Sequence, residues 1–388
     1  FYDSKLSTSK QSVVELTMKT EIKTAAIMGV IIVGIIAGLS IYFDSLEQQT
    51  GTDNTNDNQV KSPVLPSIDK SNFKKAPGLQ GISGYVNTDA NDLEGSLDGK
   101  VVLYDFWTYS CINCQRTIPY LEAWYQKYSD QGLVIVGIHS PEFEFEKNID
   151  NVRMAVDKFG ITYPVVLDND KDTWNAFSNN YWPRKYIADD EGYIRYDHIG
   201  EGSYDETEKV IQELLAERAT KLGQKMPTTQ ELVDIKEYQS SSRTPELYFG
   251  YNFVYGRNHL GNSEGFQPQK EVQYNIPQDL KLNSFYLNGV WKNLGDRMVL
   301  VSGTGTIKLP YYAKQVNIVA AGDSSLTILL DGKQIQQTDA GDDVDSNGNV
   351  STSESRLYSL VNTDEPAQHV IEIQVNKPGF QIYTFTFG

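Results

Sequence analysis

The sequence predicts an α/β domain followed by an all-β sandwich domain, with one N-terminal transmembrane helix. Three observations support this fold class. Residues 24–43 are twenty consecutive residues without a charge, which matches the length of a helix crossing the hydrocarbon core. Residues 100–219 alternate between buried-type strands and amphipathic helices, which indicates an α/β layer. Residues 244–388 contain short strand-like runs separated by Gly, Asp and Asn, which indicates an all-β sandwich.

The overall composition is that of a globular protein. Hydrophobic residues make up 39% of the chain and charged residues 22%. There are 51 acidic and 34 basic residues, for a formal net charge of −17. Binding to nucleic acid or to an anionic membrane through charge requires clustered Lys and Arg, so this balance argues against both. A solubilising acidic surface is the favoured interpretation.

The charges around the apolar run predict its orientation in the cell membrane. Lysines precede residues 24–43, and acidic residues follow it, with no lysine until Lys61. The positive-inside rule therefore predicts a single-pass protein with residues 1–23 in the cytoplasm and the bulk of the chain extracytoplasmic. A cleaved signal peptide is the alternative, because Gly38-Leu39-Ser40 is a small-x-small triplet. An uncleaved anchor is favoured, since the apolar run is longer than most signal-peptide cores.

The α/β domain is expected at residues 73–220, after a polar and flexible linker at 44–72 that lacks large apolar residues. Hydrophobic periodicity defines its elements. In order, these are a strand at 100–107, a helix at 115–130, a strand at 132–139, a helix at 148–160 closed by Gly160, a strand at 163–168, a hairpin at 184–200 turned at Glu191-Gly192, and a helix at 204–219 with acidic residues in its first turn.

A second linker is expected at residues 221–243, before the β-sandwich domain at 244–388. Nothing beyond residue 244 has convincing helical periodicity. Strand-like runs punctuated by turn residues are found at 297–303, 315–322, 325–332, 369–375 and 381–388.

The two cysteines of the chain, Cys111 and Cys114, are three positions apart. A structural disulfide is disfavoured, because closing so short a loop removes little unfolded-state entropy. Zinc is disfavoured because a Cys-x-x-Cys half-site needs two further ligands, and none of the four histidines is paired at ligand spacing. A redox pair at a strand-to-helix junction is the favoured interpretation. Cys111 would lie at the helix N-terminus, where the dipole stabilises a thiolate, and Cys114 would be shielded one turn inside.

The segment "VLYDFWTYSCINCQRTIPYLEAW" resembles the active-site segment of thioredoxin-like proteins. It is more closely similar to the extracytoplasmic part of DipZ-type thiol–disulfide interchange proteins, which are TlpA-like redoxins. Matches such as "TWNAFSNNYWPRKYIADDEGYIRYDHIGEGSYDETE" and the terminal "YTFTFG" extend the resemblance over roughly residues 75–388. It implies a thioredoxin-like fold followed by a jelly-roll-like β-sandwich. Two departures stand out: Ser110 replaces the usual Trp, and the multi-span electron-importing part of DipZ has no match here.

The resemblance also implies roles for particular residues. Asp105 matches the buried acid of thioredoxins, which would accept the proton that Cys114 loses and whose pKa desolvation should raise. Pro183 matches the family's cis-proline, and the backbone at Trp182 would pair with an extended substrate strand. His139 and Glu142 lie at the C-terminal end of a predicted strand, where they could tune the pair or serve only as loop residues.

In the predicted β-domain, "DVDSNGNVSTSE" at 343–354 fits a calcium-loop pattern. The predicted oxygen ligands are Asp343, Asp345, Asn347, Asn349 and Glu354. Without flanking helices this is no EF-hand, and a simple β-turn remains an open alternative. Asn349-Val350-Ser351 is also a glycosylation sequon, whose use would conflict with metal binding.

Other aromatic and histidine residues are interpreted as structural. Trp291, Tyr311 and Tyr312 could form a sugar-binding platform, giving the β-domain a carbohydrate or cell-surface ligand, but buried core positions are favoured. His198, His259 and His369 are expected to be structural.

The leading hypothesis is a membrane-anchored extracytoplasmic thiol–disulfide oxidoreductase that acts on protein thiols and disulfides. It needs no cofactor beyond its redox-active cysteine pair, apart from calcium if the loop binds it, and exchanges electrons with an unidentified membrane donor or acceptor. A redoxin-type peroxidase is an alternative, although "TYSC" lacks the Pro and Thr that precede a peroxidatic cysteine. A surface-binding protein whose β-sandwich carries the function is the other alternative.

Overall fold

A computed structural model describes residues 69–224, 231–254, 256 and 258–388. The predicted cytoplasmic segment 1–23, the apolar run 24–43 and the linker up to residue 68 lie outside the described residues. Among the residues that are described, no helix combines the length and apolar character needed to cross a bilayer.

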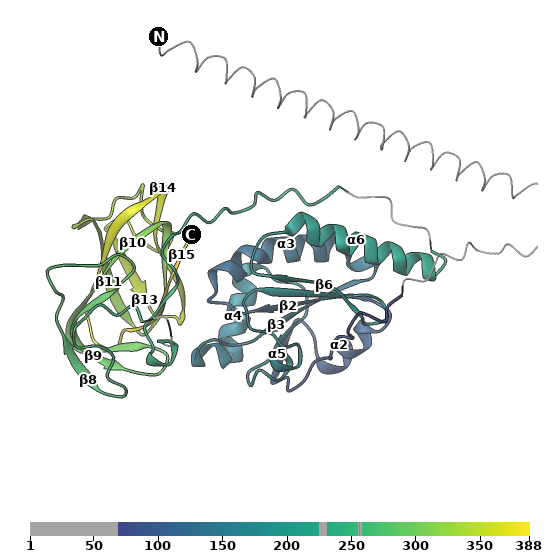
Figure 1. The fold of residues 1–388 in the computed structure, drawn as a ribbon, viewed down its shortest axis with the longest axis horizontal. Helices are drawn as coiled ribbons and strands as arrows, with labels where there is room; N and C mark the ends of the chain where they lie inside the picture. Colours follow the sequence, from purple (N-terminus) through teal and green to yellow (C-terminus); the bar gives the residue numbers. More distant parts are fainter. Residues whose placement is uncertain (1–68, 225–230, 255, 257) are drawn as a thin grey trace, which may run out of the picture. The chain divides into compact units, whose positions relative to one another are not determined.

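A six-stranded mixed sheet forms the centre of the α/β domain (Figure 1). The strand order is β1-β4-β3-β2-β5-β6, with β2, β3 and β4 parallel to one another and the other three strands antiparallel to their neighbours. The strands are β1 (Gly84–Val86), β2 (Val101–Trp107), β3 (Leu133–His139), β4 (Val165–Leu167), β5 (Arg184–Ala188) and β6 (Ile194–Ile199).

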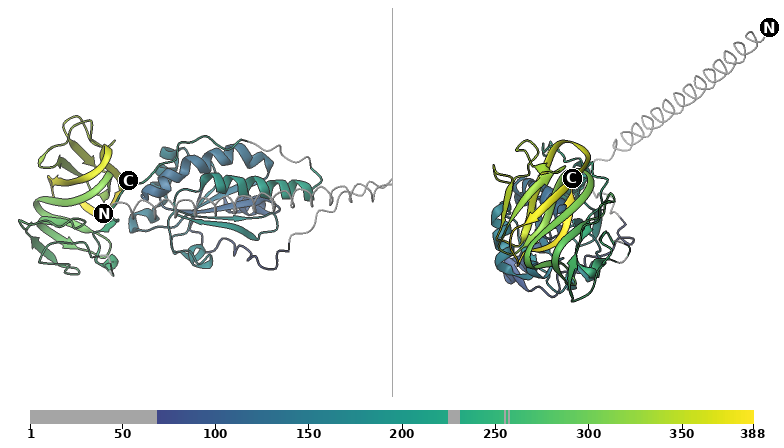
Figure 2. Two further views of the ribbon diagram at one scale, coloured as in Figure 1. Left: turned by 45° about the horizontal axis from the view of Figure 1, so that its top comes forward. Right: turned by 90° about the vertical axis from the view of Figure 1, so that its left-hand side faces the viewer.

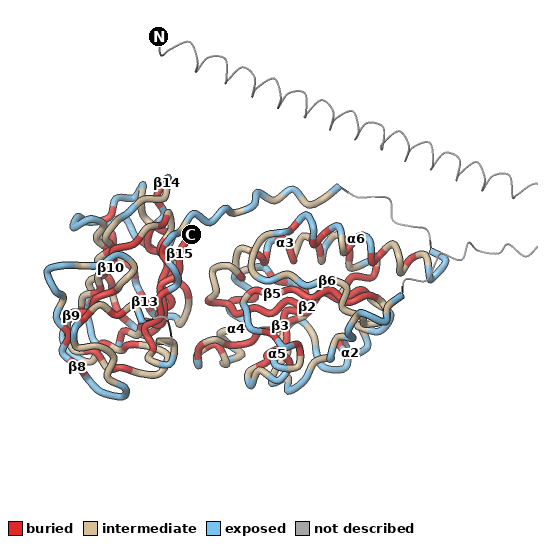
Figure 3. The backbone as a smooth tube through the Cα atoms, viewed as in Figure 1, coloured by how far each residue is buried: buried red, intermediate tan, exposed pale blue. Residues whose placement is uncertain are grey.

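Helices cover both faces of this sheet, and the alternation of side chains along β2 shows how. Val101 and Leu103 pack in one core with residues of α3 (Ile112–Tyr128), α4 (Ile149–Phe159) and α6 (Tyr204–Lys221). The residues between them, Val102 and Tyr104, pack in a second core with α2 (Ala90–Leu97) and α5 (Asp172–Ala176). Because successive strand residues point to opposite faces, a strand buried on both sides is apolar throughout. Figure 3 shows the buried residues concentrated along the central strands and the inner sides of α3 and α6.

The long elements lie close to their predicted positions. Predicted strands 100–107 and 132–139 correspond to β2 and β3, and predicted helix 148–160 to α4. Gly160 ends α4 with φ +66°, the left-handed conformation that glycine adopts without a Cβ penalty. The short elements β1, α2 and α5 were missed, since none carries enough periodic apolar residues to be recognised.

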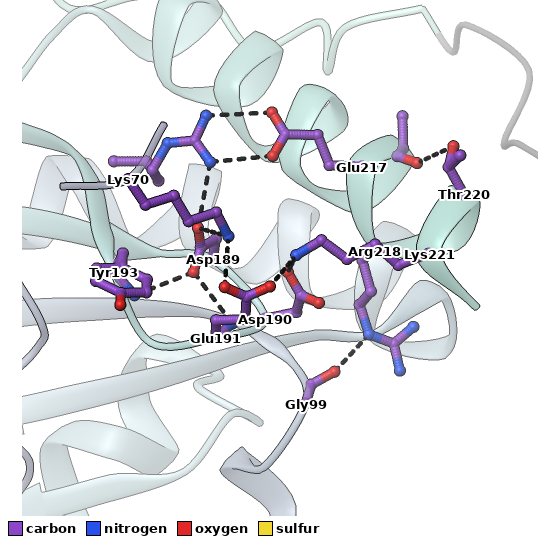
Figure 4. Close-up of polar contacts among 12 residues, drawn as sticks. Lys70, Gly99, Asp189, Asp190, Glu191, Tyr193, Glu217, Arg218, Thr220 and Lys221 are labelled. Atoms are coloured by element: carbon purple, nitrogen blue, oxygen red, sulfur yellow. Dashed lines mark hydrogen bonds and ion pairs between the residues drawn. The ribbon is translucent and has the colours of Figure 1, made fainter. Parts of the chain in front are cut away.

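A network of ion pairs lies at the end of the sheet where β2 begins (Figure 4). Lys70 contacts Asp189 at 2.7 Å, and Arg195 contacts both Asp189 and Glu217. Asp189 follows β5, and β5 runs antiparallel to β2, so this network lies beside the start of β2. It ties the first described residues and α6 to the β5–β6 hairpin.

The described residues of the C-terminal domain form strands and loops apart from one short 3-10 helix, η4 (Tyr251–Phe253), and the domain is coloured green to yellow in Figures 1 and 2. Nine described strands form one hydrogen-bonded sheet. They are β7 (Leu247–Tyr248), β8 (Glu271–Tyr274), β9 (Tyr286–Asn293), β10 (Met298–Ala321), β11 (Ser324–Leu330), β12 (Lys333–Gln334), β13 (Asn349–Thr352), β14 (Arg356–Val375) and β15 (Gln381–Phe387).

Two of these strands are much longer than the sequence indicated. The predicted runs 297–303 and 315–322 are both part of β10, which has 24 residues, and the predicted run 369–375 is the end of β14, which has 20. β10 and β14 pair along most of their length, with register shifts near Ala313 and Val316. The Gly and polar residues inside these strands were mistaken for turns. Pairing with β14 and β9 satisfies the backbone groups there, so the strand continues through residues of low strand propensity.

The segment between the two domains lacks helix and strand in its described residues 231–243, but it packs on the α/β domain. The Val233 N–H donates to Glu208 at 2.9 Å, and the Tyr120 hydroxyl donates to the Ile235 carbonyl at 3.1 Å. Arg116 lies 3.6 Å from the Tyr238 ring centroid. The segment therefore follows a defined path toward the C-terminal domain.

Candidate active site

Cys111 lies at the junction between β2 and α3, as predicted. It is the N-cap residue of α3, and its Sγ accepts a hydrogen bond from the Cys114 N–H at 3.3 Å. A helix N-terminus presents unsatisfied N–H groups that can donate hydrogen bonds to a sulfur at this position. Cys111 is partly exposed, so its sulfur is accessible to another molecule.

Cys114 differs from Cys111 in its exposure. It is 1% exposed, and both thiols are free in this structure. Burial, followed by the hydrogen bond with Cys111, raises the pKa of the Cys114 thiol well above its usual value. Cys114 therefore remains protonated until a nearby base accepts its proton.

Asp105 is a buried carboxyl group that the fold places beneath α3. It alternates with Tyr104 and Phe106 along β2, so its side chain points to the face that α3 covers. Asp105 is 1% exposed, and burial raises its pKa to about 7 despite the opposing charge of Lys185. Its Oδ1 has no hydrogen-bond partner in the described structure. A carboxyl group with a pKa near neutrality suits proton transfer at physiological pH.

Lys185 lies beside Asp105 on the neighbouring strand β5 and was not identified from the sequence. The two residues are register partners in the antiparallel pair β2–β5. Lys185 is fully buried, its Nζ donates to the Gly200 carbonyl at 3.2 Å, and burial lowers its pKa. Its position two residues after Pro183, immediately before the apolar residues Tyr186, Ile187 and Ala188, was the available signal.

The Trp182–Pro183 peptide bond is cis, as the resemblance implied. Trp182 is held by a hydrogen bond from its Nε1 to the Ser140 carbonyl at 2.9 Å and by the Trp174 ring, whose centroid is 4.3 Å away. Trp182 and Cys111 line the same cavity.

His139 supports the loop before Cys111 from within the core. It is fully buried, and burial lowers its pKa to about 3, so the ring is neutral at physiological pH. Its Nε2 accepts the Tyr109 N–H at 3.3 Å, and the two rings are stacked with centroids 5.7 Å apart.

Glu146 is a second buried carboxylate at this site that sequence reasoning missed. It lies in η3 (Glu144–Lys147) and accepts the Ser110 hydroxyl at 2.5 Å. It also accepts the N–H groups of Glu142 and Phe143, at 2.6 and 2.9 Å. The position that departs from thioredoxins, Ser110, is thus bound to the loop after β3. The run "PEFEFEKN" marked this loop only as acidic.

Residues of the C-terminal domain contact the active-site loops directly. The Tyr109 hydroxyl donates to the Ser355 carbonyl at 2.9 Å, and the Tyr383 ring lies 5.0 and 4.8 Å from the Phe143 and Phe145 rings. A cavity of about 290 Å³ opens beside Cys111. Both domains and the intervening segment line it, through residues including Cys111, Asn113, Glu142, Trp182, Glu201, Ser240, Ser242, Glu246, Tyr248 and Phe387.

The structure does not bring the predicted calcium ligands together. Asp343 pairs with Arg356 at 2.8 Å, and Glu354 pairs with the same Arg356 at 3.0 Å. Asp345 Oδ1 accepts the N–H groups of Asn347 and Asn349, at 2.8 and 2.9 Å, as in an Asx turn. Within the described part of the chain, no group of three or more His, Cys, Asp or Glu side chains is placed to hold a metal ion. The loop is a turn held by its own hydrogen bonds, with Gly348 at φ +69°.

The favoured interpretation of the aromatic residues in the C-terminal domain, buried core positions, is confirmed for Trp291 and Tyr311. Trp291 and Tyr311 are fully buried in the core of the C-terminal domain, so neither ring is available to a ligand. Tyr312 is half-buried beneath Arg243, 4.6 Å from its ring centroid. The remaining histidines hydrogen-bond locally, with His198 next to the Glu201 carbonyl, His259 next to the Asn283 carbonyl, and His369 next to the Asp331 carboxylate.

Comparison with known proteins assigns both domains to families. The family described as Redoxin matches residues 74–215, and the family described as Thioredoxin like C-terminal domain matches residues 244–388. Protein DipZ of Mycobacterium bovis is 38% identical over 316 residues, which cover 81% of this chain and 43% of that protein.

Thiol-disulfide oxidoreductase YkuV of Bacillus subtilis is 30% identical over 141 residues, which cover 36% of this chain and 94% of that protein. A solution structure of a thioredoxin-like protein in the oxidised form has 28% identity and a TM-score of 0.34, covering 37% of this chain and 97% of that one. The chain spans less than half the length of the DipZ proteins that it matches.

Proposed function

Because this chain belongs to the thioredoxin-like family of thiol–disulfide oxidoreductases, we propose that it exchanges disulfides with protein partners through Cys111 and Cys114. The difference in exposure between the two cysteines supports this proposal. Cys111 is accessible at a helix N-terminus, whereas Cys114 is buried behind it and lies on the sheet face that Asp105 occupies. An accessible nucleophile and a shielded resolving thiol are the two parts that the exchange needs.

In the reducing direction, the Cys111 thiolate attacks one sulfur of a partner disulfide. A bond forms between Cys111 and that sulfur, the partner's S–S bond breaks, and the departing sulfur takes a proton. Cys114 then gives its proton to Asp105 and attacks the Cys111 sulfur. This step closes the Cys111–Cys114 disulfide and releases the second partner thiol. Two electrons have passed to the partner, and the reverse sequence oxidises a dithiol.

The test is the unequal behaviour of two single variants. Cys111→Ser should abolish reduction of insulin disulfides, because no other accessible nucleophile starts the exchange. Cys114→Ser should retain the attack and accumulate mixed disulfides with partners, visible on non-reducing gels. Equal residual activity in the two variants would contradict the proposed mechanism.

We also propose that residues 24–43 anchor the chain in the cell membrane, with the two domains on the extracytoplasmic side. The charge-free run of twenty residues supports this, as does the change from lysines before it to acidic residues after it. An alkaline phosphatase reporter fused after Gly388 should be active, and the protein should sediment with membranes. A soluble mature chain beginning near residue 41 would show instead that the run is cleaved.

We propose that a membrane protein donates electrons to the cysteine pair or accepts electrons from it. The DipZ proteins are more than twice as long as the matched part, and the sequence match does not identify this electron partner. Disulfide trapping with Cys114→Ser in intact membranes should capture that partner together with the protein substrates.

A further inference from the structure

The segment between the two domains lies along α3 and reaches the cavity beside the reactive cysteine. Its Ile235 carbonyl accepts the Tyr120 hydroxyl at 3.1 Å, and the centroid of its Tyr238 ring lies 3.6 Å from the Arg116 guanidinium carbon. Arg116 is one helical turn before Tyr120, so the segment runs toward the N-terminal end of α3 (Figure 1). Two residues after Tyr238, Ser240 lines the cavity.

The C-terminal domain covers another side of the active-site loop. Ile112, the residue after Cys111, packs against a buried cluster to which β10, β14 and β15 contribute. On the other side of Cys111 in the sequence, the Tyr109 hydroxyl donates to the Ser355 carbonyl at 2.9 Å. Cys111 itself is partly exposed and lines the cavity. Among the described residues, the cavity is therefore the approach to Cys111 that these contacts leave open.

The size of the cavity limits what can reach Cys111. Its volume of about 290 Å³ lies at the lower end of the range for small-molecule sites, about 300–1,000 Å³. A stable contact between two folded proteins takes about 800 Å² of surface on each partner, which is the scale of a whole face rather than of a cavity. A disulfide held rigidly on such a face cannot enter this space, whereas one on an extended segment of a few residues can.

The lining also suits a peptide segment chemically. Besides carboxyl groups, it contains the Asn113 amide and the hydroxyl groups of Ser240 and Ser242, which can each donate and accept hydrogen bonds. The N–H and C=O groups of a peptide need such partners once they leave water. Trp182 and Phe387 add aromatic surface for side chains.

We infer that the segment between the two domains is a wall of the substrate site and restricts the exchange to disulfides on extended, flexible chain segments. Ser240 and Ser242 narrow the space beside Cys111. A rigid folded surface is rejected because it would have to displace this segment from α3, and specificity can arise from such a clash. The inference rests on the proposed disulfide exchange and adds the substrate class and the element that selects it.

The experiment presents the same disulfide on a folded and on an unfolded chain. Barnase with one surface cysteine is joined to glutathione through a mixed disulfide, and a truncated, unfolded form of barnase carries the same mixed disulfide. The reduced full chain is mixed with each substrate, and loss of glutathione from barnase is followed by mass spectrometry. Each rate constant is divided by that of dithiothreitol with the same substrate, which corrects for the accessibility of the disulfide to a small thiol.

We expect the normalised rate for the unfolded substrate to exceed that for the folded one about tenfold or more, equivalent to about 1.4 kcal/mol. Tyr238→Ala removes the ring that lies against Arg116 and loosens the segment, so this ratio should fall about threefold or more.

A bulky side chain at the cavity should have the opposite effect on access. Ser240→Trp should slow reduction of the unfolded substrate about tenfold or more, because the ring takes up space beside Cys111. Alkylation of Cys111 by the small reagent iodoacetamide should change by less than about twofold in the same variant. Gln239→Trp is the matched control, because Gln239 is the exposed neighbour of Ser240 outside the lining, and it should change neither rate.

The outcomes separate this inference from the proposed function. Equal normalised rates for the two barnase substrates, an unchanged ratio in Tyr238→Ala, or full activity of Ser240→Trp on the unfolded substrate would overturn the inference alone. Failure to reduce neutral 2-hydroxyethyl disulfide any faster than Cys111→Ser does would overturn the disulfide exchange itself. The comparison of folded and unfolded substrates needs no variant of this chain, so it decides the question even if a substitution unfolds the protein.

Discussion

Replacing Asp105 with Asn should stabilise the α/β domain, and the gain should depend on pH. Burial raises the pKa of Asp105 from 3.8 to about 7, a difference of about three pKa units. At 1.36 kcal/mol for each, ionised Asp105 costs on the order of 4 kcal/mol in the folded state. Asn resembles the protonated acid in shape and cannot ionise, so the variant avoids this cost.

The direction in which stability changes with pH follows from the direction of the pKa change. Because the folded pKa lies above the unfolded one, the folded state binds the proton more tightly. The resulting stability is present below pH 4 and is lost as the pH rises through about 7. The advantage of Asp105→Asn should therefore grow from about 1.7 kcal/mol at pH 5 to about 4 kcal/mol at pH 8. Lys185 loses a neighbouring negative charge in the variant, which reduces both values, so we expect an increase of about 2–3 kcal/mol between the two pH values.

Urea unfolding of the reduced chain, followed by tryptophan fluorescence, measures this difference. Four of the five tryptophans lie in the α/β domain, so the signal reports mainly on that domain. Asp157→Asn, on an exposed part of α4, is the matched control and should change the free energy of unfolding by less than about 0.5 kcal/mol at either pH. An identical gain for Asp105→Asn at pH 5 and pH 8 would refute the argument, because it would mean that Asp105 titrates normally.

Two further substitutions test the contacts around the cysteine pair. Ser110→Ala removes one of the groups that donate to buried Glu146, so it should lower the free energy of unfolding by about 1–3 kcal/mol in urea titrations; an unchanged midpoint would show that the Ser110 hydroxyl is not bound there. Tyr383→Ala removes a ring that is 3% exposed and packs against Phe143 and Phe145, so thermal unfolding should show a loss of about 3–5 kcal/mol. A loss below about 1 kcal/mol would mean that the contact of Tyr383 with Phe143 and Phe145 does not stabilise the loop after β3.

Several features of the site could be predicted because they depend on neighbouring residues. A nearly continuous apolar run defines β2, the helical period defines α3, and the boundary between them places Cys111 at a helix N-terminus. Asp105 was singled out by the resemblance to thioredoxins, and the structure places it on the face of β2 that α3 covers. A strand or a helix can be recognised in this way because its pattern repeats within a few consecutive residues.

Other features depend on residues that are distant in the sequence. Glu142 and Glu246 share the Tyr248 hydroxyl across 104 residues, and the pairing of β10 with β14 keeps β10 continuous through residues that resemble turns. The 343–354 loop fits a calcium pattern locally, but Arg356 and the backbone N–H groups occupy its carboxylates. The local sequence pattern placed the cysteine pair at a strand-to-helix junction, and the resemblance to thioredoxins singled out Asp105. Only long-range packing decided what surrounds them, because the partner of a buried charge is set by which distant surfaces the folded chain brings into contact.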